Sequence, residues 1–291
     1  MMQQPQMNIG EMVLHHASDS YEIGFDGVFN NRFVWHWQKW PDTHLGPLTV
    51  NLTPTKHVIF MTLAAVLVFV TMRLAGRALV RQRAGETAPK GFAAGIEGLV
   101  LWVRNDIAIE NIGPNGAKFA PFILTLFFFI LYMNLLGLFP WGASPTANIA
   151  VTAGLAILVF LVVEIAGFRK LGLKGYLKTI FIDIPGVTGP AGVIMSVLMS
   201  PIELVGKFTK PFALAVRLFG NLVAGHFVIL SLFGIVLLFG YLAYWNWMIG
   251  VTTAALVLGI MMLELFVASL QAYVFALLSA TFIGMMQSEH H

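Results

Sequence analysis

The sequence contains no cysteine, and charged residues make up only 11% of its 291 positions. The absence of cysteine excludes disulfides and thiolate metal sites, and it removes the usual indicator of redox compartment. The shortage of charge is more informative, because soluble domains carry roughly 25% charged residues. With 58% hydrophobic residues, the chain has the composition of a protein whose solvent is lipid.

Five apolar stretches are candidate bilayer crossings, each of which requires about 20 residues. We therefore predict an all-α polytopic membrane protein with about five membrane-crossing helices. The predicted crossings cover residues 57–72, 119–139, 149–168, 191–242 and 247–286. Because the last two stretches are too long for one perpendicular crossing, we expect long, strongly tilted helices or helices lying partly in the membrane plane.

Two further segments complete the predicted organisation. Residues 1–55 are polar and rich in turn formers, and residues 56–291 are expected to form a single membrane domain. Residues 89–118 mix charged and apolar side chains. This mixture is typical of an amphipathic helix at the membrane surface, or of a helix buried against its neighbours.

The basic residues set the predicted orientation. Four arginines follow the first stretch and four arginines or lysines follow the third, whereas loops 140–148 and 241–247 contain none. Because positive loops stay on the cytoplasmic side, we predict an N-terminus outside and a C-terminus inside. Glu164, in the third stretch, is expected to reach the interface near Arg169.

Few polar or ionisable residues lie deep in the apolar stretches. The candidates are Arg217, Asn221, His226, Glu264 and Gln271. A charge at the membrane centre costs roughly 2.5–3.5 kcal/mol on insertion scales, so such residues are functional candidates. Glu203 is a further candidate nearer the cytoplasmic end.

Helical spacing arranges these candidates in pairs. Arg217 and Asn221 are four residues apart and share a face, whereas His226 lies about 180° around the helix and about 13.5 Å along it from Arg217. Glu264 and Gln271 lie about 10.5 Å apart on nearly one face. The last two helices must run antiparallel. If the arginine is level with Gln271, then His226 falls within about 3 Å in height of Glu264.

The pairs predict different chemistry. A His–Glu pair can pass protons near neutral pH, because imidazole titrates there and a neighbouring carboxylate tunes it. Arg217 cannot release its proton, so it cannot be a relay group; it can be a fixed positive barrier and attract a partner's carboxylate. Gly220 and Gly225 lie nearby, where small residues let another helix approach closely.

Structural roles remain alternatives for several candidates. His226 and Glu264 could form a purely structural hydrogen-bonded pair, and the two amides could simply join helices. Glu203 could form a helix-surface ion pair with Lys207, four residues further on.

Four segments resemble subunit a of the rotary (F-type) ATP synthases. Residues 217–226 read RLFGNLVAGH, 264–275 read ELFVASLQAYVF, 134–140 read NLLGLFP and 201–211 read PIELVGKFTKP. The resemblance covers nearly the whole chain beyond residue 50. It implies a proton-conducting stator subunit in which Arg217 separates two half-channels against a rotating ring of subunit c.

The resemblance also implies places for the other candidates. Gln271 would lie beside the arginine, and Asn221 would belong to the proton path. His226 and Glu264 would line the outer half-channel, and Glu203 would lie toward the inner one. Histidine on the fourth stretch and glutamate on the fifth is the order of mitochondrial members, whereas some bacterial members exchange them.

One position departs from part of this family. At Gly137 some bacterial members carry an aspartate, so that contribution to the outer half-channel is absent here or supplied elsewhere.

The resemblance also implies partners and a location. The implied partners are the c-ring, the peripheral-stalk subunit b and the remainder of the complex, without nucleic acid, and the implied location is a bacterial inner membrane. The surroundings of the ring carboxylate decide between H⁺ and Na⁺.

The sequence lacks the motifs that other functional classes require. No P-loop is present, so ATP chemistry would belong to partner subunits and this chain would not be an enzyme by itself. No cofactor or metal is expected, because His15, His16, His36 and His44 match no ligand spacing. The rival functions are a stand-alone secondary ion transporter or channel, for which no internal repeat is visible, and a non-conducting membrane scaffold.

Overall fold

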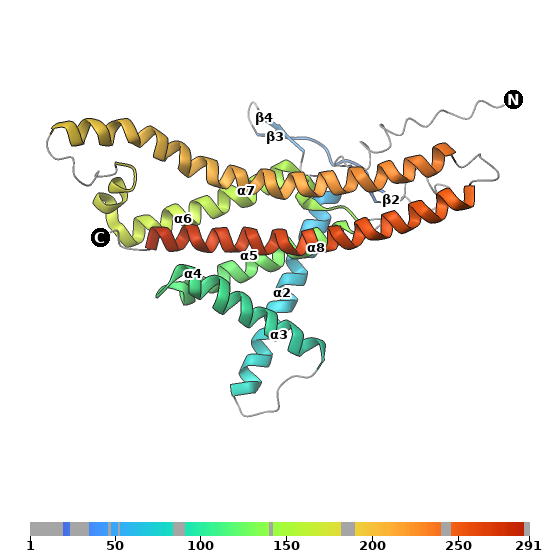
Figure 1. Ribbon diagram of the computed structural model, residues 1–291, viewed down its shortest axis with the longest axis horizontal. Coiled ribbons are helices and arrows are strands. Elements are labelled where there is room, and N and C mark those ends of the chain that lie inside the picture. The colour runs from blue at the N-terminus through green and yellow to red at the C-terminus, as the bar shows by residue number, and fades with distance from the viewer. Residues whose placement is uncertain are drawn as a thin grey trace. The chain divides into compact units, whose positions relative to one another are not determined.

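The computed structural model describes residues 20–23, 35–45, 48–51, 53–83, 91–139, 142–181, 190–239 and 246–287. Helices dominate this part of the chain (Figure 1). The elements are β1 (Glu22–Ile23), β2 (Trp35–His36), β3 (Thr43–Leu45), β4 (Leu48–Val50), α2 (Lys56–Arg83), α3 (Phe92–Trp102), η1 (Val103–Ile109), α4 (Glu110–Ile112), α5 (Gly116–Gly137), η2 (Pro145–Ala147), α6 (Ile149–Lys178), α7 (Pro190–Phe239) and α8 (Asn246–Gln287).

Five described helices are long and apolar enough to cross a membrane, namely α2, α5, α6, α7 and α8. The predicted all-α polytopic fold is therefore confirmed. Two helices extend beyond their predicted crossings: α2 continues past residue 72 to Arg83, and α6 continues past residue 168 to Lys178 with an interruption at Gly172. Arginine and lysine are good helix formers, so the helix outlasts its apolar part.

The last two helices far exceed the thickness of a bilayer, and Figure 1 shows them as the longest elements. α7 has 50 residues and α8 has 42, which correspond to about 75 Å and about 63 Å at 1.5 Å per residue. Since a hydrocarbon core is roughly 30 Å thick, neither can stand perpendicular to it. Pro201 and Pro211 lie inside α7, where each removes one backbone donor.

Short strands precede the first helix, a feature that the sequence analysis missed. β1 pairs antiparallel with β2, and β3 with β4. Two hydrogen bonds join this segment to the start of α2: Trp37 Nε1 donates to the Pro54 carbonyl at 2.8 Å, and the Lys56 amide donates to the Ser20 carbonyl at 3.0 Å. Much of the predicted N-terminal segment 1–55 lies outside the described residues.

The chain divides into two compact units. The first unit takes residues up to Phe69, Phe129–Asn148 and Leu218–Gln271, and the second takes Val70–Phe128, Ile149–Arg217 and the residues from Ala272 onward. α7 and α8 each contribute to both units. A single membrane domain over residues 56–291 stays a prediction.

The amphipathic segment predicted at 89–118 becomes the run α3–η1–α4. Its buried apolar residues are Val100, Val103, Ile107, Ala108 and Ile112, and its exposed charged residues are Arg104, Asp106 and Glu110, whereas Glu97 is buried. Trp102 stacks on Tyr273 of α8 at 5.5 Å between ring centres and meets Phe127 of α5 edge-on at 6.3 Å. The segment is therefore both amphipathic and packed against neighbouring helices of the second unit.

α6 is interrupted at Gly172, which has φ 66° and ψ 178°. This backbone region is essentially restricted to glycine. A straight helix would separate Glu164 from Tyr176 by about 18 Å, yet the Tyr176 hydroxyl donates a hydrogen bond to the Glu164 carboxylate. The glycine thus turns the last residues of α6 back toward the body of the helix.

We expect Gly172→Ala to destabilise the protein by about 1–3 kcal/mol, because a side chain strains this backbone conformation. Gly154→Ala is the matched control. It lies in the same helix, and an added Cβ there meets nothing within 4 Å, so it should be neutral or stabilising by up to about 1 kcal/mol. Thermal unfolding of the detergent-purified protein distinguishes the two variants. Equal midpoints would contradict the account of the turn.

Candidate functional site

Arg217 lies in α7, inside the apolar window Ile194–Ile229. Its side chain is exposed, and within the described residues it makes no hydrogen bond or ion pair. A guanidinium is always charged in a protein and is expensive to leave facing lipid. An exposed guanidinium inside an apolar helix makes Arg217 a candidate for contact with a group beyond the described residues.

One face of α7 around this arginine is small and polar, and the exposed side chains of Phe212 and Val216 lie beside it. Its exposed members are Ala213, Arg217, Gly220, Asn221 and Ala224, and spacings of three and four residues place them on one helix face. A Cβ added at Gly220 would meet nothing within 4 Å. The neighbouring residues Leu214, Ala215, Leu218 and Leu222 are buried. One face of α7 thus packs inside the chain, and the arginine face stays open to a close partner.

Glu264 is buried in the first unit, with 5% of its side chain exposed. Its Oε1 lies 2.7 Å from the point where a Cβ on Gly225 would stand. The missing side chain of Gly225 therefore makes room for this carboxylate. His226 follows Gly225 in α7, but its side chain lies outside the described part of the structure.

This contact changes the interpretation of one glycine. The sequence analysis expected both Gly220 and Gly225 to admit another helix close to the arginine. At Gly225 the neighbour is Glu264 of the same chain, whereas Gly220 is open.

The other candidates are distributed between the two units. Gln271 is buried in the first unit, whereas Arg217 belongs to the second, so their predicted pairing stays a prediction.

Glu203 is half-buried in α7. The alternative ion pair between Glu203 and Lys207 is not formed in the described residues, because the Lys207 ammonium faces Glu164 at 3.6 Å. Glu164 contacts Lys207 and Tyr176 rather than the region of Arg169.

A buried polar network in the first unit was missed by the sequence analysis. Asn134 Nδ2 donates to the Ala268 carbonyl at 3.1 Å, and the Thr146 hydroxyl donates to Asn134 Oδ1 at 2.7 Å. The Ser144 and Thr146 hydroxyls lie 2.8 Å apart. Asn134 and Thr146 are fully buried. The sequence pattern that could have predicted this network is the amide of Asn134 within an apolar run, followed closely by a loop with the hydroxyls of Ser144 and Thr146.

The network explains the glycine at position 137. A Cβ added at Gly137 would lie 2.3 Å from the Cβ of Ser144, so the loop leaves no space for a larger residue. Polar groups near this position come from the loop hydroxyls. Because Asn134 bonds the carbonyl of Ala268, four residues after Glu264, the network also fixes α8 one turn from the buried carboxylate.

Five long apolar helices among the described residues identify a multi-pass membrane protein, and the ionisable residues inside them are typical of ion or substrate pathways. The model of the family described as ATP synthase A chain matches residues 58–284. The chain belongs to this family. That membership sets aside the stand-alone transporter and the non-conducting scaffold.

Similar proteins agree with this assignment. ATP synthase subunit a of Anaeromyxobacter dehalogenans (strain 2CP-C) is 40% identical over 283 residues, covering 95% of this chain and 70% of that protein. The Myxococcus xanthus (strain DK1622) protein of the same name is 43% identical over 267 residues, covering 91% and 82%. ATP synthase subunit a 2 of Chlorobaculum tepidum is 40% identical over 280 residues, covering 95% and 72%.

We expect Asn134→Ala to destabilise the protein by about 1–3 kcal/mol, because it leaves the buried Thr146 hydroxyl without its acceptor. Thr146→Val should cost a similar amount, and the double variant less than the sum of both. Thr125→Val is the control, since that exposed hydroxyl bonds only a carbonyl of its own helix. Thermal unfolding of the purified complex measures all four. Additive losses would contradict a coupled network.

Proposed function

We propose that Arg217 is the fixed positive barrier between two half-channels and the partner of a carboxylate on the rotating c-ring. Family membership makes the chain a proton-conducting stator subunit of the ATP synthase membrane sector. ATP chemistry lies on other subunits of that complex. The observation that supports the barrier is the exposed guanidinium on the open face of α7, which has no hydrogen-bond or ion-pair partner among the described residues.

The charge of Arg217 explains how a barrier would work. A nearby cation favours the ionised form of a carboxylate, so a ring carboxylate that reaches the arginine gives up its proton. Arginine cannot carry the proton onward, so the two sides exchange protons only through rotation of the ring. The small residues Gly220 and Ala224 on the same face allow the ring helix to come close.

The outer half-channel is proposed to use His226 and Glu264. The burial of Glu264 against Gly225, next to His226 in the chain, supports this pairing. Imidazole and carboxylate together can pass a proton near neutral pH. The buried Gln271 is proposed to lie beside the arginine, and the exposed Asn221 to line the proton path on the ring side.

The inner half-channel is proposed to include Glu203. It lies fourteen residues before Arg217 in α7, about 21 Å along the helix.

The placement of the basic loops supports a cytoplasmic C-terminus and an N-terminus on the outer side of a bacterial inner membrane. Subunit b of the peripheral stalk is the proposed stationary partner.

We expect Arg217→Ala to abolish ATP-driven proton transport and to permit passive leak through the membrane sector. Arg217→Lys should also fail, since lysine can lose its proton when desolvated and lacks the planar fork. The control is Arg77→Ala, an exposed arginine of α2, which should pump at nearly the native rate. Proton flux in vesicles, with and without the soluble head, is the measurement. Near-native pumping by Arg217→Ala would overturn the barrier.

Exchanging His226 and Glu264 should impair pumping less than replacing either one with alanine. The exchange keeps both group types in the same space, whereas His226→Ala leaves a buried carboxylate without its proposed partner. The initial rate of ATP-driven proton uptake ranks the three variants. Equal losses in all three would show that the positions matter and the pair does not.

A further inference from the structure

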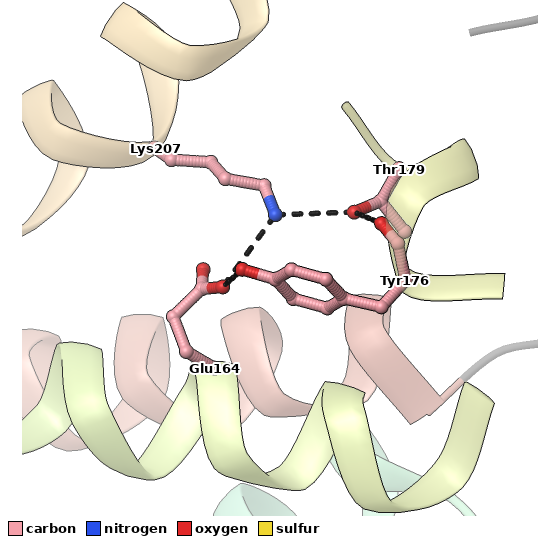
Figure 2. Close-up of polar contacts among 4 residues, drawn as sticks. All are labelled: Glu164, Tyr176, Thr179 and Lys207. Atoms are coloured by element: carbon pink, nitrogen blue, oxygen red, sulfur yellow. Dashed lines mark hydrogen bonds and ion pairs between the residues drawn. The ribbon is translucent and has the colours of Figure 1, made fainter. Parts of the chain in front are cut away.

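A partly buried ion pair joins Lys207 to Glu164 in the second unit (Figure 2). The Lys207 ammonium of α7 lies 3.6 Å from Glu164 Oε2 of α6 and donates to the Thr179 hydroxyl at 3.1 Å. It also lies 4.5 Å above the ring of Tyr176, whose hydroxyl donates to Glu164. We call these four residues the Lys207 clamp.

The clamp is a product of the turn at Gly172. That turn brings Tyr176 and Thr179 back against Glu164, so that two segments of the chain enclose one ammonium. Lys207 and Glu164 are 10% and 16% exposed. Opposite charges with further polar partners are the form in which a low-dielectric site tolerates ions. The clamp therefore keeps the Lys207 side chain pointing toward Glu164.

Without the clamp, α7 itself would offer Lys207 another partner. Glu203 precedes it by four residues, and a glutamate four positions before a lysine is the favoured arrangement for a helical ion pair. The half-buried Glu203 side chain forms no hydrogen bond or ion pair within the part of the chain that the structure describes. The next cation along α7, Lys210, lies 5.6 Å from the ring centre of Phe282.

We propose that Glu164 is a positioning residue that holds the Lys207 ammonium away from Glu203. This inference rests on the proposed inner half-channel role of Glu203. A proton-exchanging carboxylate must spend part of its cycle protonated, and an adjacent ammonium favours the ionised form. Keeping Lys207 on Glu164 leaves Glu203 able to take up and release protons.

The test uses the assembled complex in inverted membrane vesicles. The initial rate of ATP-driven proton uptake is measured per amount of assembled complex. Glu164→Gln frees Lys207 to pair with Glu203. Because an opposite charge changes the proton affinity of a carboxylate by about ten- to a thousandfold, we expect a loss of about tenfold. Adding Lys207→Gln should restore the rate to within about twofold of native.

A matched control separates this mechanism from loss of structure. Lys174 is an exposed lysine beyond the turn in α6 and is not part of the clamp. Glu164→Gln with Lys174→Gln has the same net charge as the rescued variant, but it leaves Lys207 free, so its rate should stay low. A purely structural clamp predicts no rescue by Lys207→Gln. Native pumping by Glu164→Gln, or an unrescued double variant, overturns the inference.

Two additional variants cover the remaining outcomes. If the Glu164→Gln complex does not assemble, Tyr176→Phe with Thr179→Val loosens the clamp without changing charge. We expect this double variant to lose part of the pumping rate, and Lys207→Gln to reverse that loss. A native rate in the double variant, or a loss that Lys207→Gln does not reverse, overturns the inference.

Glu203→Gln tests the proposed function separately. If it pumps at the native rate, the role of Glu203 is wrong. If it is slow while Glu164→Gln is native, only the positioning role is wrong.

Discussion

The free energy of holding a guanidinium inside a membrane-crossing helix is the constraint on which the rest of this structure depends. Arg217 faces outward from α7 with no partner in the described residues, and such a charge costs several kcal/mol against lipid. The proposed ring carboxylate would supply the opposite charge that this guanidinium requires. The small residues Gly220 and Ala224 beside it would let the ring helix come close.

Polar contacts hold the long helices in place, because lipid supplies no hydrophobic force between them. Asn134 ties α5 to α8 in the first unit. In the second unit, the Gln287 amide donates to the Ala166 carbonyl of α6 and accepts from Asn115, which precedes α5. The Lys207 clamp joins α6 to α7 in the same unit. These contacts tie helices together within each unit.

Much of this organisation could be predicted from composition and helical spacing. Apolar length identified all five crossing helices, and the cost of buried charge singled out Arg217 and Glu264. Periodicity could not show that Tyr176 would bond Glu164, because that contact depends on a chain reversal at one glycine with positive φ. The network of Asn134, Ser144 and Thr146 was missed because it joins a helix to a loop, and spacing within a helix carries no information about such contacts.

The most direct test of the central claim is the position of the Arg217 guanidinium in the assembled complex. A cryo-EM map of the purified ATP synthase would show this side chain together with the ring helix opposite it. The account predicts a ring carboxylate within about 4–6 Å of the guanidinium, the range over which opposite charges alter protonation, with the open face of α7 covered by the ring. An arginine that faces lipid, or that pairs with a carboxylate of its own chain, would contradict it.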